Sequence, residues 1–183
     1  MLSIYGHSLH LALSCFSYII NYMEIITYGD ELLRQKAEKI EKIDAEIAEI
    51  SNKMLEILVK DKGVGVAGPQ VGYMKRIFIT CAAGDEPRVF INPSILETSH
   101  NTVKFEEGCL SVPGVYAQVV RAESIKIQAW NEKGRPFTLE ASGLLARVIL
   151  HEYDHLEGVL FIDHLPEKKR DKVIEKYEKN KKK

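Results

Sequence analysis

Cysteine is scarce in this chain of 183 residues, and neither sign of charge is in large excess. Three cysteines, Cys15, Cys81 and Cys109, are too few and too scattered for a disulfide framework, and an odd number is typical of a reducing compartment. We therefore expect a cytoplasmic protein. The formal net charge of −1 does not favour nucleic acid as the main ligand of the whole surface, so we expect no DNA partner.

Long apolar runs are also missing. Residues 1–22 are largely apolar but contain no Lys or Arg and no small-residue cleavage site, so they do not resemble a secretory signal. They are too interrupted for a membrane span, which needs about 20 unbroken apolar residues. We expect no membrane partner. Because Met23 opens a sequence of ordinary composition, we expect 1–22 to be an N-terminal extension outside the domain and 23–183 to form a single domain.

A metal-binding pattern is present in the sequence HEYDH at residues 151–155. In a helix, His151 and His155 lie on one face and can hold one divalent metal ion together. Glu152 then sits beside the metal without being a ligand, where it can take a proton from a water that the metal activates. The pattern favours a metal-dependent hydrolase over a surface helix with two unrelated histidines.

An apolar stripe leads into this motif. Leu144 and Val148 precede His151 at helical spacing, which predicts an apolar pocket beside the metal. Ser142 is a candidate N-cap for this helix, and Gly158 stands where a C-terminal glycine belongs. We expect this to be the central, buried helix of the fold.

A third protein ligand is needed, because two histidines do not complete a metal site. Cys109 lies among small residues, and a thiolate binds Zn(II) or Fe(II) well, although a buried cysteine can also be a plain apolar residue. The alternative third ligand is a carboxylate downstream, such as Glu175, which would make the protein a zinc endopeptidase.

A glycine-rich segment at residues 63–72 (GVGVAGPQVG) lies far upstream of these ligands. No Lys-Ser/Thr follows it and no strand precedes it, so neither nucleotide-binding fingerprint fits. Backbone with so little side chain can approach an extended peptide at a strand edge, and Gln70 supplies a hydrogen-bond donor near its end. A plain surface loop is the other interpretation.

The remaining pattern predicts an α+β fold. Asp44 is a plausible N-cap for an amphipathic helix that ends near Gly63, and Asp30 can cap a short helical turn. Alternating apolar residues predict antiparallel strands at 76–81, 88–92, 102–107, 115–121, 124–130 and 135–141. We expect these strands to wrap around the central helix. Residues 166–183 carry nine basic and four acidic residues and predict a basic C-terminal helix.

Three segments together resemble the bacterial peptide deformylases. GVGVAGPQ is similar to that family's GxGxAxxQ motif, EGCLS at residues 107–111 is identical to its EGCLS motif, and HEYDH is similar to HExDH. The motifs occur in the family's order over about residues 23–165. The resemblance implies antiparallel sheets around the HExDH helix, and hydrolytic removal of the formyl group from N-formylmethionyl nascent peptides.

Roles for individual residues follow from this resemblance alone. It implies that the metal ligands are Cys109, His151 and His155. It implies that Glu152 is the general base and then the acid, and that Gln70 and the backbone N–H of Leu110 hold the oxyanion. It further implies that the methionine pocket and peptide groove are shaped by Val64, Gly65 and Leu144.

The resemblance also implies a cofactor and a partner. The metal is expected to be Fe(II) in the cell, with Zn(II) or Ni(II) as substitutes, and the C-terminal basic helix is expected to reach the ribosome. Two positions depart from the family's usual residues: Tyr116 stands where an Arg is frequent, and Leu150 stands where Gln often precedes the first His.

Overall fold

The computed structural model describes residues 23–82 and 85–182. Its α-helices are α2 (Ala45–Lys60), α3 (Gly143–Leu156) and α4 (Glu167–Lys181), and its short 3-10 helices are η1 (Glu31–Arg34), η2 (Gly68–Val71) and η3 (Phe161–His164). Its strands are β1 (Gly65–Ala67), β2 (Ile77–Thr80), β3 (Arg88–Thr98), β4 (Thr102–Cys109), β5 (Val112–Ala122), β6 (Ser124–Trp130) and β7 (Pro136–Ser142).

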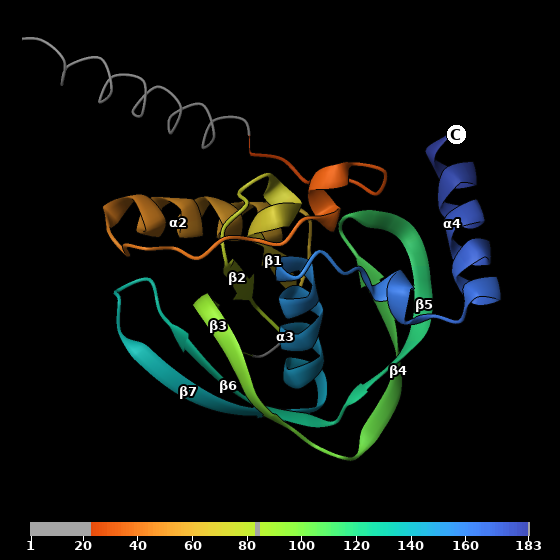
Figure 1. Ribbon diagram of the computed structural model, residues 1–183. Coiled ribbons are helices and arrows are strands. Elements are labelled where there is room, and N and C mark those ends of the chain that lie inside the picture. The colour runs from red at the N-terminus through yellow and green to blue at the C-terminus, as the bar shows by residue number, and fades with distance from the viewer. Residues whose placement is uncertain (1–22, 83–84, 183) are drawn as a thin grey trace, which may run out of the picture.

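Two antiparallel sheets enclose α3, as the sequence predicts for an α+β fold. One sheet has five strands in the order β1-β2-β3-β6-β7, and the other is the two-stranded ribbon β4-β5. Figure 1 shows α3 between the two sheets, with α2 above the larger sheet and α4 beyond β5. Because β1 is the first strand in the order, one of its edges carries no strand in the described part of the chain.

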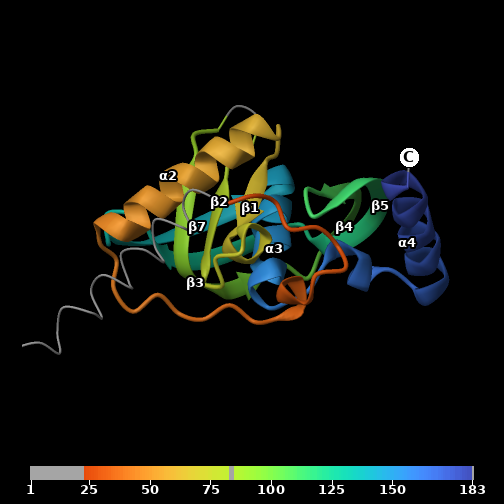
Figure 2. The same ribbon diagram turned by 90° about the horizontal axis from the view of Figure 1, so that it is seen from above.

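Strand β2 is buried along its whole length because both of its faces are covered. Ile77 and Ile79 pack in one cluster with the apolar face of α2, including Met54. Phe78, between them in the sequence, belongs to the cluster on the other face, which includes Ile149 of α3. This alternation follows from the opposite directions of successive side chains in a strand. The larger sheet therefore lies between α2 and α3 (Figure 2).

A third cluster joins the ribbon to the C-terminal part of the chain. Val115 and Val119 of β5 pack with Phe161 of η3 and Tyr177 of α4. The Tyr177 hydroxyl donates to the Tyr28 carbonyl at 3.2 Å. The predicted basic helix is thus present as α4, and one aromatic residue anchors it.

The helix caps agree with the sequence in three places and differ in one. The side chains of Asp44 and Asp30 accept backbone hydrogen bonds from Glu46 and Leu32, at 3.1 and 2.9 Å. Gly158 has the positive φ of a glycine that ends a helix. Ser142 precedes α3 but makes no capping bond with its side chain. It remains the last residue of β7 and pairs with Ser124, so the strand, rather than a cap, places its backbone.

Strand β3 is longer than the predicted strand at 88–92. Asn92 and Pro93 signal a turn in the sequence, yet pairing with β6 resumes at Ser94 after a register shift. Asn92 takes a φ of 48° at this irregularity, and its side chain bonds both backbone groups of Ile40. A bulge therefore accommodates a turn-forming residue inside a strand. The ribbon strands β4 and β5 also extend further than predicted, to Cys109 and from Val112.

Two further expectations concern the limits of the domain. The predicted extension at residues 1–22 lies outside the described residues, and Met23, the first described residue, is buried in the cluster beneath α2. Among the residues that the structure describes, no helix combines the length and apolar character that crossing a bilayer requires.

Candidate active site

Three side chains on two elements form a compact group of metal-ligating atoms. His151 and His155 project from one face of α3, with ring centroids 5.1 Å apart. Cys109 ends β4, and its Sγ lies 3.3 Å from His155 Nε2. One potential ligand atom from each residue lies within 4.8 Å of the others. In residues 23–82 and 85–182, no other group of three or more His, Cys, Asp or Glu side chains meets this geometry.

The donor set fits a first-row divalent metal ion. Two imidazoles and one thiolate are ligands that Zn(II) and Fe(II) accept, and three protein ligands leave one position open. Burial, followed by the neighbouring Glu152 carboxylate, raises the pKa of Cys109 to about 12. Burial is the main reason why the pKa of His155 is lowered well below its ordinary value. The pocket thus keeps His155 neutral, and a cation in it would favour the Cys109 thiolate.

Glu107 lies at the centre of a buried network of charged side chains that contacts His151. It accepts from Arg121 Nε at 2.7 Å, from Arg147 Nη1 at 2.6 Å and from His151 Nδ1 at 3.0 Å. Burial by itself would raise the pKa of Glu107, but hydrogen bonds from His151 and Arg121 lower it far below its ordinary value. Because an ionised carboxylate only accepts, His151 must carry its proton on Nδ1. Its Nε2 lone pair is then free for a metal.

Gln70 is held in place from both ends of its amide. Its Oε1 accepts from the backbone N–H of Ala67 at 2.8 Å, and its Nε2 lies 3.2 Å from Ser111 Oγ and 3.4 Å from Cys109 Sγ. The side chain is almost completely buried. The short helix η2 therefore presents an immobilised N–H donor beside the candidate metal ligand.

Glu152 faces β1 from the neighbouring position on α3. Gly65 lies so close that a Cβ added to it would stand 2.8 Å from both Cγ and Cδ of Glu152. The Glu152 atom Oε2 is buried and has no hydrogen-bond partner within the described part of the chain. Burial is the main reason why the pKa of Glu152 is raised well above its ordinary value. A carboxyl group with these surroundings is suited to exchanging protons.

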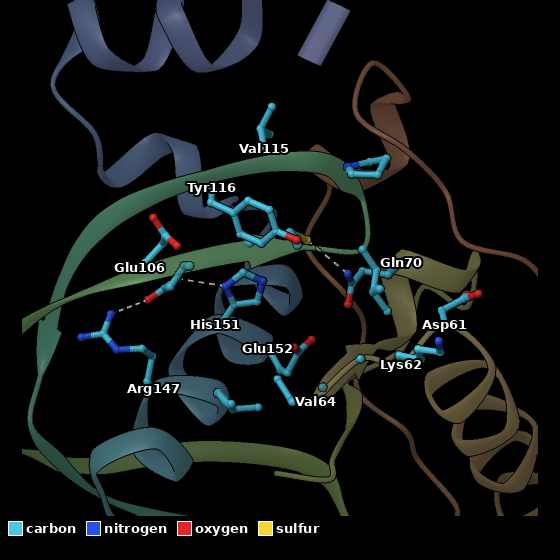
Figure 3. Close-up of a pocket in the computed structure, with 18 of the residues that line it drawn as sticks. Asp61, Lys62, Val64, Gln70, Glu106, Val115, Tyr116, Arg147, His151 and Glu152 are labelled. Atoms are coloured by element: carbon cyan, nitrogen blue, oxygen red, sulfur yellow. Dashed lines mark hydrogen bonds and ion pairs between the residues drawn. The ribbon is translucent and has the colours of Figure 1, made fainter. Parts of the chain in front are cut away.

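A cavity of about 410 Å³ brings the predicted residues together. Its lining includes all but one of the residues to which the family resemblance assigns a role, namely Val64, Gly65, Gln70, Cys109, Leu110, Leu144, His151 and Glu152. The exception, His155, lies one turn further along α3 and is almost completely buried. Val148 also lines the cavity, which agrees with the predicted apolar stripe. Figure 3 shows His151 and Glu152 on one side of the pocket and Gln70 across from them.

The two positions that depart from the family pattern have different surroundings. Tyr116 lies at the rim of the cavity, where its side chain is exposed and one side of its ring contacts Gly108 (Figure 3). Leu150 is partly buried and packs against the cluster between α3 and the larger sheet. Tyr116 can therefore meet a ligand, whereas Leu150 contributes to packing.

Several residues around the site were not singled out from the sequence. Glu107 belongs to a quoted motif, but its partners Arg121 and Arg147 are 14 and 40 residues away along the chain. Ser111, which lies beside the Gln70 amide, closes the same motif. No local spacing connects Glu107 with Arg121 or Arg147. The one available signal is the charged Arg147 inside the helix that is expected to be buried.

The alternative third ligand, Glu175, is not favoured. It lies on α4 with an exposed side chain, and Lys179 donates to it at 2.7 Å. The group of potential ligand atoms contains Cys109 in its place.

Comparisons with known proteins point to one family. The family model described as polypeptide deformylase matches residues 22–171. A peptide deformylase of Borreliella burgdorferi is 46% identical over 156 residues, which cover 85% of this chain and 94% of that protein. One of Clostridium botulinum is 52% identical over 141 residues, covering 77% and 95%.

Solved structures give the same result. A peptide deformylase from Legionella pneumophila superposes with a TM-score of 0.83 at 38% identity, covering 87% of this chain and 95% of that one. The enzyme from Synechococcus elongatus in complex with actinonin gives a TM-score of 0.81 at 39% identity, covering 85% of each chain. The chain therefore belongs to the polypeptide deformylase family.

Proposed function

We propose that the protein is a peptide deformylase, which hydrolyses the formamide bond of N-formylmethionyl nascent peptides and releases formate. The observation that carries this proposal is one cavity that joins three kinds of group. These are the Cys109 and His151 ligand atoms, which form a metal-ligating group with the buried His155, the Glu152 carboxyl, whose Oε2 has no partner among the described residues, and the fixed amide of Gln70.

The candidate ligands set the position of the reaction. A divalent metal held by Cys109, His151 and His155 would supply a Lewis acid, which polarises the formyl oxygen and makes water a better nucleophile. Glu107 keeps the His151 ring in the tautomer and orientation that this requires. The protein's own part is to hold these groups in a fixed, buried geometry.

Glu152 moves the protons in this proposal. It takes one from the attacking water as the new carbon–oxygen bond forms at the formyl carbon. It returns a proton to the amine as the carbon–nitrogen bond breaks, so that formate and a free methionyl amine leave. Its raised pKa suits a group that must act first as a base and then as an acid.

Gln70 and Leu110 stabilise the negative oxygen that develops at the formyl group. The Gln70 Nε2 is held beside Cys109, and Leu110 follows Cys109 in the sequence and lines the same cavity, so its backbone N–H is the second donor in this proposal. A preorganised donor of this kind typically lowers the barrier by about 3 kcal/mol.

The peptide binds along β1. An extended chain can pair at Gly65 with the edge of β1 that carries no strand in the described residues, since strand addition needs only unpaired backbone groups. Val64, directly before the strand, lines the cavity beside this edge. Leu144 and Val148 then face the methionine side chain from α3. One edge is sufficient for a chain that ends at its formyl group, whereas an endopeptidase needs the chain to continue on both sides of the metal.

The metal in the cell is Fe(II) in this proposal, with Zn(II) or Ni(II) as working substitutes. A thiolate ligand beside a ferrous ion is open to oxidation, so activity should decay in air with Fe(II) and persist with Zn(II) or Ni(II). The protein works in the cytoplasm on chains that leave the ribosome. Residues from Met23 onward form its catalytic domain.

Formate release tests the proposal. The protein is loaded with Fe(II) without oxygen and incubated with a formyl-Met-Ala-Ser peptide, and formate is measured with a coupled dehydrogenase. Mass spectrometry follows the peptide. We expect one formate for each formyl group lost and no internal cleavage. Internal cleavage without formate, with Fe(II), Zn(II) or Ni(II), would instead support the endopeptidase.

A further inference from the structure

His164 lies at the end of η3, outside the cavity, and forms a polar contact with the metal-binding helix. Its Nε2 is 2.7 Å from Asp154 Oδ2, and its side chain is 35% exposed. An ionised carboxylate has no proton to give, so the imidazole must donate. Asp154 belongs to the HEYDH motif and lies next to His155 in the sequence.

A continuous series of hydrogen bonds leads from this contact to a candidate metal ligand. The oxygen of Asp154 that accepts from His164 also accepts from Arg121 Nη1 at 2.7 Å. Arg121 then donates through Nε and Nη2 to both oxygens of Glu107, at 2.7 and 3.0 Å. Glu107 Oε2 in turn accepts from His151 Nδ1 at 3.0 Å. His164 is therefore four contacts away from the ligand.

The charges along this series make its members depend on one another. The Arg121 and Glu107 side chains are only 4% and 5% exposed, and a buried charge is costly unless it is paired. Asp154 holds Arg121 Nη1, the nitrogen that does not bond Glu107, and so limits how the guanidinium can turn. His164 gives Asp154 a second donor, which restricts how the carboxylate can turn.

The turn that carries His164 is itself firmly held against α3. Asp163 accepts from the backbone N–H of Leu160 at 2.8 Å and pairs with Arg34. Phe161, at the start of the turn, stacks on His151 with ring centroids 6.1 Å apart. The position of His164 is thus defined by contacts other than its own, so replacing its side chain should leave η3 in place.

We propose that His164 is a positioning residue for the metal centre. By holding Asp154 and, through it, Arg121, it fixes the Glu107 carboxylate against His151 and keeps the His151 Nε2 directed at the metal. The inference rests on the proposed function only in taking the Cys109, His151 and His155 group as a metal site. Partners behind a metal ligand typically change metal affinity by about 10- to 100-fold.

Zinc affinity tests the inference without reference to activity. The zinc-loaded protein is titrated with a coloured chelator, and the dissociation constant is obtained from the zinc transferred. We expect His164→Ala to weaken zinc binding about tenfold and His164→Gln, which keeps an N–H donor, to stay within about threefold of the original. His100→Ala, which removes another exposed histidine, should have no effect.

A double variant separates positioning from a general structural effect. In an Asp154→Asn background, His164→Ala should weaken zinc binding by less than about twofold, because its route to the ligand is already changed. Circular dichroism of the zinc-loaded variants confirms that they are folded. The inference is overturned if His164→Ala leaves the zinc affinity unchanged, or if its full effect persists in the Asp154→Asn background.

These outcomes remain distinct from those of the deformylase proposal. A protein that shows the expected zinc affinities but releases no formate would contradict the proposed function alone. A protein that releases formate, with a zinc affinity indifferent to His164, would contradict this inference alone.

Discussion

Gly65 of β1 lies directly against the carboxyl group of Glu152 on α3, with no room for a side chain between them. The contact joins the strand expected to bind the peptide to the group expected to move the proton. The close approach explains why a glycine stands at this position. Its φ is not positive, so its backbone conformation alone does not require glycine.

Gly65→Ala should therefore displace Glu152 rather than strain the strand. We expect the variant to fold and to bind its metal, and kcat for deformylation to fall about 100-fold, as is typical when a catalytic group moves by about 1 Å. Steady-state kinetics with metal analysis measures both. Val66→Ala, whose side chain packs in the cluster with α2 and does not line the cavity, is the control for a general effect on β1. An unchanged kcat in Gly65→Ala would show that the contact is not needed.

Glu152→Ala should separate proton transfer from metal binding. Because Glu152 is not among the clustered ligand atoms, we expect the variant to keep its metal while kcat falls by about 10²- to 10⁴-fold. Cys109→Ala is the matched control and should lose its metal. Atomic absorption of both purified variants gives the answer. If Glu152→Ala lost metal as fully as Cys109→Ala, the role assigned to Glu152 would be wrong.

Gln70→Glu tests the oxyanion donor with almost no change in shape. The new carboxylate can still accept from Ala67 N–H, as Oε1 of Gln70 does now, but it has no N–H to offer. We expect kcat to fall about 10²- to 10³-fold. The thermal midpoint should fall as well, because the new carboxylate is buried without a cationic partner, so the kinetics are measured at a temperature where circular dichroism shows the variant to be folded. An unchanged kcat would show that the Gln70 N–H is not needed.

The sequence predicted the parts of this fold that depend on local patterns. The apolar period of α2 and the two histidines one turn apart on α3 were readable because a helix repeats over a few residues. The sequence identifies Glu107 only as part of the EGCLS motif. Its structural role depends on Arg121 and Arg147, which are distant in the sequence and contact it only in the folded protein. The end of β3 was misjudged because Asn92 and Pro93 signal a turn locally, and only contact with Ile40 makes them part of a bulge.

Removal of residues 1–22 tests the proposed limit of the domain. Met23 is already buried in the cluster beneath α2, so a chain that begins there retains this contact. We expect the shortened protein to have the same thermal midpoint and the same kcat as the full chain. Differential scanning calorimetry and the formate assay compare the two. A midpoint lowered by several degrees would show that the first 22 residues stabilise the domain.

The basic helix α4 gives the last prediction, which concerns contact with the ribosome. Lys168, Lys169, Lys172 and Lys176 are exposed on α4, so they are free to meet RNA phosphates, whereas Tyr177 anchors the helix to the domain. Deleting the helix would remove the four lysines and the Tyr177 anchor together. The four lysines are therefore replaced with Gln, and Tyr177 is kept. Cosedimentation with ribosomes should then weaken, and the remaining binding should depend less on salt, because counterion release scales with the number of phosphates contacted.

Replacing Glu175, Glu178 and Asp171 with Gln is the matched control: it alters charge on the same helix in the opposite direction and should strengthen cosedimentation. Equal cosedimentation of all three proteins would mean that α4 is a solvated helix, held by pairs such as that of Glu175 with Lys179, and that ribosome contact, if it occurs, uses another surface.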